Sequence, residues 1–490
     1  MDAAALALAH HGTRSLGEVL APAIALADGF PMYEFLRRHL ESERPACEPY
    51  EWTMRTYYPG GRVVPAGETF RQPNLARTLR FLAEAERAAL ARGASRVEAI
   101  RAGRDAFYRG HLARRIVEAS RAAGGVFTEE DLAQYEGRIE RPYSVSYRGH
   151  EAFKAGPWNQ SPVLLQSLNL LEGFDLAAMG AGSADAIHTI VEAVKLAYAD
   201  RDRYYGDPDF VRVPIAGLLS KRYAAARRAL IDMGRASLEQ RPGDPLPFDD
   251  PAEPPAPIGR TASGHGVAGR ATLLRPPVVS SPAASAPRER AATAEGDTTA
   301  IEVVDAAGNL FSATPSSGWL LGGAFVAGDT GVPLSNRMQA FHLDPASPNV
   351  LAGGKRPRTT LTPTIVLRSG RPFLAIGTPG GDNQDQQILL VLVNLIDFGL
   401  GLQAAIEAPR FNSLHFASSF GDHQAEPGVL EVEDSLMADV QAALEARGHL
   451  LRTRPAFGIS TGVVAAGWDP ATGRLRGGAD PRRERYVVAW

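Results

Sequence analysis

The sequence predicts a mixed chain of helices and strands, with helices before residue 242 and strands prevailing after residue 297. Two observations support this expectation. In the first part, apolar residues recur every three to four positions, which is the period of an amphipathic helix. After residue 297, apolar and polar residues alternate, which is the period of a strand. The chain has 490 residues, 44% of them hydrophobic, so it is long enough for about three domains and a sizeable core.

Helical periodicity predicts three stretches in the first part, at 3–9, 74–123 and 186–204. Between them, Thr128 followed by Asp131 three positions later predicts a capped helix start. The segment 147–151 is typical of a strand edge or turn.

The segment 242–297 separates the two parts. It holds 11 of the 36 prolines and a single aromatic residue, Phe248. Such a composition buries too little apolar surface to offset chain entropy, which predicts a loop or a disordered segment. On composition alone, a linker between two domains explains it equally well.

Beyond this segment the sequence predicts a hairpin, a second strand pair and a buried helix. The hairpin turns at Gly308-Asn309, and the second pair turns at 368–371. The expected elements are strands 299–305, 310–314, 363–367 and 373–377 and the helix 386–398.

Charge and cysteine content exclude several classes of protein. The net charge is −3 and the pI is near 6.4, which argues against nucleic-acid or membrane-surface binding. A single cysteine, Cys47, excludes an intrachain disulfide framework and multi-cysteine metal sites. We find no signal peptide and no apolar run of spanning length. The chain as written therefore predicts a cytoplasmic protein, although an incomplete N-terminus would leave a periplasmic location open.

Three patterns resemble known sites but lack the required context. The GxGxxG at 264–269 lies within the proline-rich segment, without the flanking strand and helix of a dinucleotide site. The GxSxG around Ser460 has no histidine after it, so the order of a serine hydrolase is missing. His188 and Glu192 have metal-ligand spacing, but no further ligand is evident, and a solvated helix face is expected.

The boundary between Asp297 and Thr298 suggests chemistry, because an exposed gap there meets a buried strand. If the chain is cut at this bond, Thr298 gains a free α-amine beside its own hydroxyl. An α-amine has a pKa of about 8, so it can accept the hydroxyl proton and activate the nucleophile. A strand that happens to begin with two threonines is the simpler alternative. The later turn at Gly380-Gly381 could supply backbone N–H groups for an oxyanion hole.

The order of these segments resembles the γ-glutamyltransferase family, also called γ-glutamyltranspeptidases. The resemblance covers nearly all of the chain outside 242–297. It is carried by GRDAFYRGHLARRIV (103–117), GGVFTEEDLAQY (124–135), LAYADRDRYYGDPDFV (196–211), TTAIEVVDAAGNLFSAT (298–314), VAGDTGVPLSNRMQAF (326–341), KRPRTTLTPTIVL (355–367), GTPGG (377–381), EAPRF (407–411) and GADPR (478–482).

The resemblance implies an α+β fold, the four-layer αββα sandwich of N-terminal-nucleophile hydrolases. It implies a large-subunit part at 1–241, a flexible tail at 242–297 and a small subunit at 298–490, together forming one folded unit. Cleavage between Asp297 and Thr298 would make Thr298 the nucleophile and base. The remaining implied roles are support of the nucleophile by Ser316, an oxyanion hole at Gly380 and Gly381, and substrate binding by Thr359 and Thr360.

Several positions depart from the family pattern. Ala340 stands where an Asp commonly holds the substrate amine, and Arg337 and Gly318 replace polar or acidic residues. Losing a charge-assisted bond costs about 1.5–3 kcal/mol, so a free γ-glutamyl amine should bind worse. Arg337 instead suits a carboxylate. These changes, together with Trp158 in a reshaped pocket loop, resemble the acylase and oxamate-amidohydrolase-like branch.

The expected protein is an amidohydrolase or acyltransferase acting on γ-glutamyl or related small acyl amides, without metal or organic cofactor. Its expected partners are the amide substrate and the two subunits of its own precursor, with neither nucleic acid nor membrane involved. The family's N-terminal Gly-Gly-Asn-Ala-Val-Asp-Ala-Ala stretch is absent from the sequence. An inactive, truncated paralogue is therefore the alternative.

Overall fold

The computed structural model describes residues 1–249, 296–319, 322–459, 461–469 and 472–490. The GxGxxG pattern, Ser460 and most of the proline-rich segment lie outside these residues. The chain divides into two compact units, the first made of 1–139 with 317–336 and the second of 140–316 with 337–490.

The first unit is mainly helical. The predicted helices form, although the stretch expected at 74–123 is divided into three helices. Three helices of the unit begin with a reciprocal capping box, at Ser15, Ser95 and Thr128, and the one at Ser15 was not predicted. Its elements are α1 (Asp2–His11), α2 (Leu16–Asp28), β1 (Phe30–Pro31), α3 (Glu34–Cys47), α4 (Glu51–Tyr57), β2 (Thr69–Phe70), α5 (Pro73–Ala91), α6 (Arg96–Tyr108), α7 (His111–Ala122) and α8 (Glu129–Ala133).

A buried carboxylate joins two helices of this unit. Glu86 of α5 is 2% exposed, and its two oxygens accept hydrogen bonds of 2.6 and 2.7 Å from the backbone N–H groups of Leu16 and Gly17. These N–H groups belong to the first turn of α2, where no helical partner exists. The charge of Glu86 also complements the positive end of the helix dipole.

The second unit carries the predicted strands. Its helices are α9 (Pro162–Leu171), α10 (Leu176–Met179), α11 (Ala184–Tyr204), α12 (Ile215–Leu218), α13 (Lys221–Arg228), α14 (Asn383–Ile396), α15 (Leu402–Glu407) and α16 (Ala438–Ala446). Its strands are β3 (Tyr143–Tyr147), β4 (His150–Lys154), β5 (Gly296–Thr298), β6 (Ile301–Val304), β7 (Leu310–Ala313), β9 (Thr364–Arg368), β10 (Arg371–Gly377), β11 (Phe411–Ser413), β12 (Val429–Glu433), β13 (Leu450–Arg454), β14 (Val464–Asp469) and β15 (Arg474–Ala479), while β8 (Ser316–Trp319) starts here and continues into the first unit.

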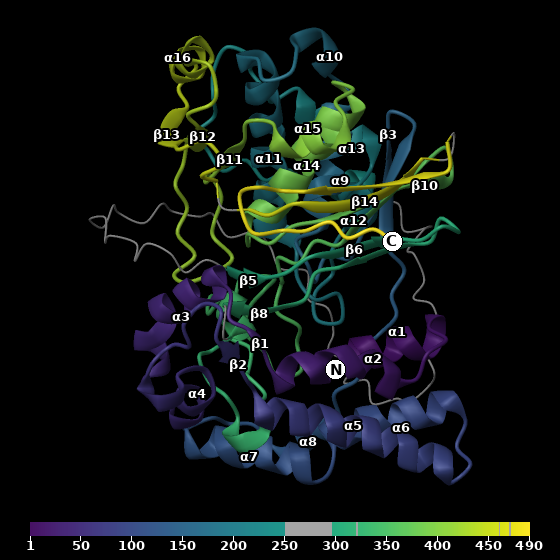
Figure 1. Ribbon diagram of the computed structural model, residues 1–490. Coiled ribbons are helices and arrows are strands. Elements are labelled where there is room, and N and C mark those ends of the chain that lie inside the picture. The colour runs from purple at the N-terminus through teal and green to yellow at the C-terminus, as the bar shows by residue number, and fades with distance from the viewer. Residues whose placement is uncertain (250–295, 320–321, 460, 470–471) are drawn as a thin grey trace. The chain divides into compact units, whose positions relative to one another are not determined.

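Six strands form an antiparallel sheet in the order β15-β14-β10-β9-β4-β3. Side chains alternate between the two faces of a strand. In β10, Leu374 and Ile376 therefore face the core with α14, whereas Gly377 faces Glu302 and Ala300 in and beside β6. The hairpin β6–β7 packs on this second face, and α9 and α14 pack on the first (Figure 1).

The predicted hairpin and strand pair are confirmed with small shifts at their ends. β6 pairs antiparallel with β7, and β9 pairs antiparallel with β10. The outer face of the hairpin exposes Ile301, Val303 and Phe311. Within the described residues, none of the helices combines the length and apolar character needed to cross a membrane.

Candidate active site

Thr298 ends β5 and is 6% exposed. Its hydroxyl donates a 3.0 Å hydrogen bond to Ser316 Oγ, and the next residue, Thr299, donates its backbone N–H to Pro315 O at 3.1 Å. Two bonds thus fix the start of this segment against residues 315–316. Because the chain is continuous at Asp297, the Thr298 nitrogen is an amide, and an amide nitrogen cannot serve as the base.

Arg337 lies beside this pair of hydroxyls. It opens a short 3-10 turn, and its Nη2 donates to Ser316 Oγ at 2.6 Å. Its Nη1 lies 3.4 Å from Thr360 Oγ1, a longer hydrogen bond. Ser316 Oγ therefore accepts from both Thr298 and Arg337, which places the guanidinium within two hydrogen-bond lengths of the Thr298 hydroxyl.

Thr359 and Thr360 belong to the segment that precedes β9. Thr359 forms two backbone hydrogen bonds with the loop containing Trp158, to Trp158 O and from Gln160 N, at 3.1 and 2.8 Å. The Thr359 hydroxyl is buried and has no hydrogen-bond partner within the described residues. A buried hydroxyl without a partner is rare in folded proteins and suits a group that meets a ligand.

The loop Gly380-Gly381 joins β10 to α14. Both residues have positive φ, 127° and 56°, which glycine adopts at low cost. Their carbonyls accept hydrogen bonds from Asn383 N and Gln384 N at 3.0 and 3.2 Å, so the loop is fastened to the first turn of α14. Within the described residues, neither glycine N–H has a hydrogen-bond partner, as an oxyanion hole requires.

Phe420 completes the surroundings of the loop, and sequence reasoning missed it. A Cβ on Gly381 would lie 3.0 Å from the Phe420 ring, so the two residues are in close contact. The Arg337 guanidinium carbon lies 5.7 Å from the centre of the same ring. Phe420 thus lies against both the glycine loop and the Arg337 guanidinium, and no local pattern in the sequence indicates this.

The N-cap of α14 is held by a buried cation that the sequence analysis also missed. Arg201 Nη1 lies 2.5 Å from Asp382 Oδ1, and Ser419 N donates to Asp382 Oδ2 at 2.7 Å. Burial alone lowers the pKa of Arg201, but Asp202 and Asp382 outweigh it and raise the pKa above its usual range. The guanidinium therefore stays charged.

The structure joins four of the predicted site residues by direct contacts and brings the glycine loop near them only through neighbouring residues. Direct contacts join Thr298, Ser316, Arg337 and Thr360. The glycine loop follows Gly377, where a Cβ would lie 3.2 Å from Ala300 Cβ, next to the Thr298 segment.

Ala340 and Gly318, two of the positions that depart from the family pattern, differ in their surroundings. Ala340 is 1% exposed, and its carbonyl accepts a hydrogen bond from Asn349 Nδ2. Gly318 belongs to the first unit, where a Cβ would lie 1.8 Å from Asn336 Oδ1.

The expected solvated face at His188 and Glu192 is wrong, because both side chains are buried within the second unit. A third residue, His449, joins them, with its Nε2 2.9 Å from His188 Nδ1. The Glu192 carboxylate accepts hydrogen bonds from Lys195 and Arg241 at 2.7 and 2.8 Å. Two cations already neutralise it, so this group fits a structural network better than a metal site.

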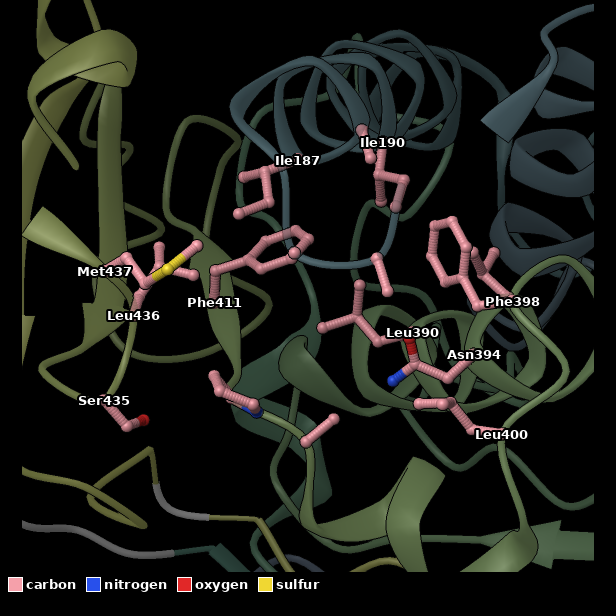
Figure 2. A pocket seen from close by; sticks show the side chains of 16 residues that line it. Ile187, Ile190, Leu390, Asn394, Phe398, Leu400, Phe411, Ser435, Leu436 and Met437 are labelled. Carbon is pink, nitrogen blue, oxygen red and sulfur yellow. The ribbon is translucent and has the colours of Figure 1, made fainter. Parts of the chain in front are cut away.

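A cavity of about 270 Å³ lies elsewhere in the second unit, between α11, α14 and the segment 434–437 (Figure 2). Figure 2 shows Ile187, Ile190, Leu390 and Phe411 around it. Its lining is almost entirely apolar and includes none of the predicted site residues. The cavity therefore does not mark the site around Thr298.

Comparison with known proteins identifies the class first. The structure matches the solved cephalosporin acylase from Bacillus halodurans with a TM-score of 0.79 and 28% identity, over 100% of this chain and 77% of that one. The α+β fold of N-terminal-nucleophile hydrolases is thereby confirmed.

The sequence then identifies the family. Residues 2–490 match the family Gamma-glutamyltranspeptidase. The chain is 33% identical to the "Glutathione hydrolase proenzyme" of Escherichia coli (strain K12), over 97% of this chain and 72% of that protein. It is also 33% identical to the "Acylase ACY 1 proenzyme" of Pseudomonas sp. (strain SE83), over 99% of this chain and 73% of that protein. The chain belongs to the γ-glutamyltranspeptidase family of enzymes.

Proposed function

We propose that this protein is a self-processing amidohydrolase whose nucleophile is Thr298. The observation that carries the proposal is the hydrogen-bonded series from Thr298 Oγ1 through Ser316 Oγ to Arg337. It places a threonine hydroxyl, a second hydroxyl and a cation at the start of the segment that cleavage would free. The proenzyme names of the relatives support the same proposal.

Processing cuts the bond between Asp297 and Thr298. The large subunit then comprises 1–241 with the tail 242–297, and the small subunit comprises 298–490. The two chains remain together as one folded enzyme. Cleavage turns the Thr298 amide nitrogen into an amine with a pKa of about 8, which can accept the hydroxyl proton near neutral pH.

In the mature enzyme, Thr298 Oγ attacks the carbonyl carbon of an amide substrate, and the amine of Thr298 takes the hydroxyl proton. The N–H groups of Gly380 and Gly381 hold the oxyanion. The amine returns the proton to the leaving nitrogen, and an acyl ester on Thr298 remains. Water attacks this ester, releases the acid and restores the hydroxyl; an acceptor amine in place of water gives acyl transfer.

The acyl group is expected to carry a carboxylate close to the scissile carbonyl. Arg337 lies within two hydrogen-bond lengths of the nucleophile, and Thr359 and Thr360 add hydroxyls for the same carboxylate. An oxamate-type amide has its carboxylate on the scissile carbonyl itself, which suits a cation so near. A γ-glutamyl group has a distant carboxylate and a free amine, and Ala340 offers that amine no acidic side chain.

Self-cleavage is tested by gel electrophoresis of the purified protein. Splitting 52.4 kDa at residue 297 gives fragments of roughly 32 and 20 kDa. Thr298→Ala is expected to remain a single band, whereas the matched control Thr299→Ala, at the neighbouring exposed threonine, is expected to be cleaved. A wild-type protein that remains uncleaved would refute this proposal and favour a non-enzymatic paralogue.

The acyl group is tested on the cleaved protein with oxamate, short acyl amides and γ-glutamyl anilide. We expect kcat/KM to be highest for amides with a carboxylate next to the carbonyl. The relatives named glutathione hydrolase make γ-glutamyl amides the second candidate. A clear preference for γ-glutamyl anilide would contradict our account of Arg337 and Ala340 and establish that second candidate.

A further inference from the structure

Beneath the glycine loop lies a buried ion pair that the proposed reaction does not use. Lys154 ends β4 and Asp385 lies in the first turn of α14; their side chains are 0% and 1% exposed. Lys154 Nζ lies 3.0 Å from Asp385 Oδ1. The sequence patterns at these two positions gave no indication that they meet.

Lys154 contacts two oxygens besides the carboxylate. Its Nζ donates hydrogen bonds to Thr364 Oγ1 at 2.9 Å and to Thr362 O at 3.2 Å. Its contact with Asp385 is an ion pair, and no hydrogen bond reaches either oxygen of that carboxylate within the described residues. Lys154 thereby joins three parts of the unit: the end of β4, the start of β9 and the first turn of α14.

Asp385 is close to the loop in the chain and is fastened to it. It lies four positions after Gly381, and the carbonyls of Gly380 and Gly381 accept hydrogen bonds from the N–H groups of Asn383 and Gln384 in the same turn. A shift of the first turn of α14 therefore shifts the glycine loop. The carboxylate of Asp385 also complements the positive end of the helix dipole.

A second carboxyl group links this region to the strand that follows Thr298. Glu302 of β6 lies against Gly377, where a Cβ would be 2.3 Å from Glu302 Oε1. Glu302 thus joins the strand that follows Thr298 to the end of β10, which leads into the glycine loop. Glu302, Lys154 and Asp385 all belong to the second unit.

We infer that Lys154 and Asp385 are positioning residues, which fix the Gly380-Gly381 loop so that its N–H groups meet the oxyanion formed at Thr298. The inference rests on the proposed function. Neither residue touches the reacting atoms. They hold the first turn of α14 in place, and with it the N–H groups of Gly380 and Gly381.

The test compares this ion pair with a second buried pair that lies on α11. Lys195 and Glu192 are 2% and 1% exposed and 2.7 Å apart. Lys195→Met removes a buried lysine from a carboxylate just as Lys154→Met does, but it does so away from the glycine loop. Any effect that follows from lost stability alone appears in both variants.

Hydrogen–deuterium exchange gives the first measurement, because it needs no substrate. We expect Lys154→Met to speed exchange of the amides at 380–385 by about tenfold, since the turn loses its anchor. Lys195→Met is expected to leave these amides unchanged. Equal exchange in the two variants overturns the inference, whether or not the protein hydrolyses amides.

Kinetics on the cleaved enzyme give the second measurement. Removing one oxyanion donor typically lowers kcat by 10²–10³, so a displaced pair of donors should lower kcat by about 30-fold in Lys154→Met, with KM within about twofold. The double variant K154M/D385N leaves no buried charge unpaired, so its melting temperature should recover. Its kcat is expected to stay low; recovery of kcat along with stability would show a purely structural role. A wild-type enzyme inactive on all amides would instead refute the proposed function and leave the exchange result to decide this inference.

Discussion

Two polar clusters of the second unit differ in the residue types they use. The cluster on α11, made of His188, Glu192 and His449, has the side chains usually associated with acid–base or metal chemistry. The candidate site has two hydroxyls, a guanidinium and a glycine loop. In the α11 cluster, Lys195 and Arg241 bond to the Glu192 carboxylate and the two histidines bond to each other, although His449 Nδ1 lacks a partner in the described part of the chain. In the candidate site, the two glycine N–H groups and the Thr359 hydroxyl lack partners among the described residues. The carboxylate of the α11 cluster is thus already bound, whereas the candidate site offers several unused hydrogen-bonding groups.

The largest expected effect is a loss of folding stability when the α11 cluster is changed. Glu192→Gln removes a buried carboxylate that neutralises Lys195 and Arg241, and breaking a buried pair costs about 3–5 kcal/mol. We expect the free energy of unfolding, measured by urea denaturation, to fall by that amount while kcat/KM of the folded protein stays within about twofold. A loss of turnover without a loss of stability would place the α11 cluster in the reaction.

The second expected effect is a loss of kcat/KM when Arg337 of the candidate site is changed. Arg337→Gln keeps a hydrogen-bond donor near Ser316 but removes the positive charge. We expect kcat/KM for an amide with an adjacent carboxylate to fall about 100-fold, as for a lost charge-assisted bidentate contact, and to change little for an uncharged acyl amide. The two substrates are compared on one protein sample, so a folding defect lowers both values. Equal losses for both substrates would contradict a carboxylate-binding role.

The smallest effect concerns Glu302, which lies between the hairpin and the sheet. Burial raises the pKa of Glu302 to about 9, although Ser312 and Lys154 favour the ionised form. Its pKa in the unfolded chain is near 4.5, so the folded protein holds the proton more tightly. The resulting stability is full below pH 4.5 and is lost as pH rises towards 9.

Glu302→Gln removes this titration. The comparison uses the Thr298→Ala background, which is expected to remain one chain. From pH 6 to pH 8, the unfolding free energy of the Gln variant relative to the Glu form should rise by about 2.6 kcal/mol, because the Glu form loses stability over this range. Urea unfolding at the two pH values measures this gain. An unchanged difference between the two forms would show that Glu302 is ionised in the folded protein.

Local patterns predicted a number of the helices and strands but few of the contacts. The hairpin turn at Gly308 and the capped start at Thr128 depend on neighbouring residues, so one stretch of sequence suffices to predict them. The helix 186–204 was correctly placed, but the solvated face expected on it was wrong, because α11 is buried on all sides over most of its length. Polar residues at helical spacing indicate a solvated face only when other elements leave that face uncovered.

The candidate site was predicted unevenly for the same reason. Thr298 and the glycine loop stand at chain features, a boundary and a strand-to-helix turn, that composition and turn residues reveal. Phe420 and Lys154 act through partners far along the chain, at Gly381 and Asp385, and no periodicity records such pairs. The roles of Thr298, Ser316, Arg337 and the glycine loop stay predictions until the variants are measured.

The position of Thr298 within β5 has a kinetic consequence. In the proposed cleavage, the hydroxyl of Thr298 breaks the peptide bond of its own residue, so maturation is expected to be a first-order event within each molecule. Its half-time should be the same at nanomolar and micromolar protein, and mixing with already mature enzyme should not shorten it. Such reactions benefit from effective concentrations of about 10⁵–10⁸ M in well-oriented cases, which no partner in solution can match. The proposed cleavage therefore predicts that the rate of maturation does not depend on the concentration of the protein.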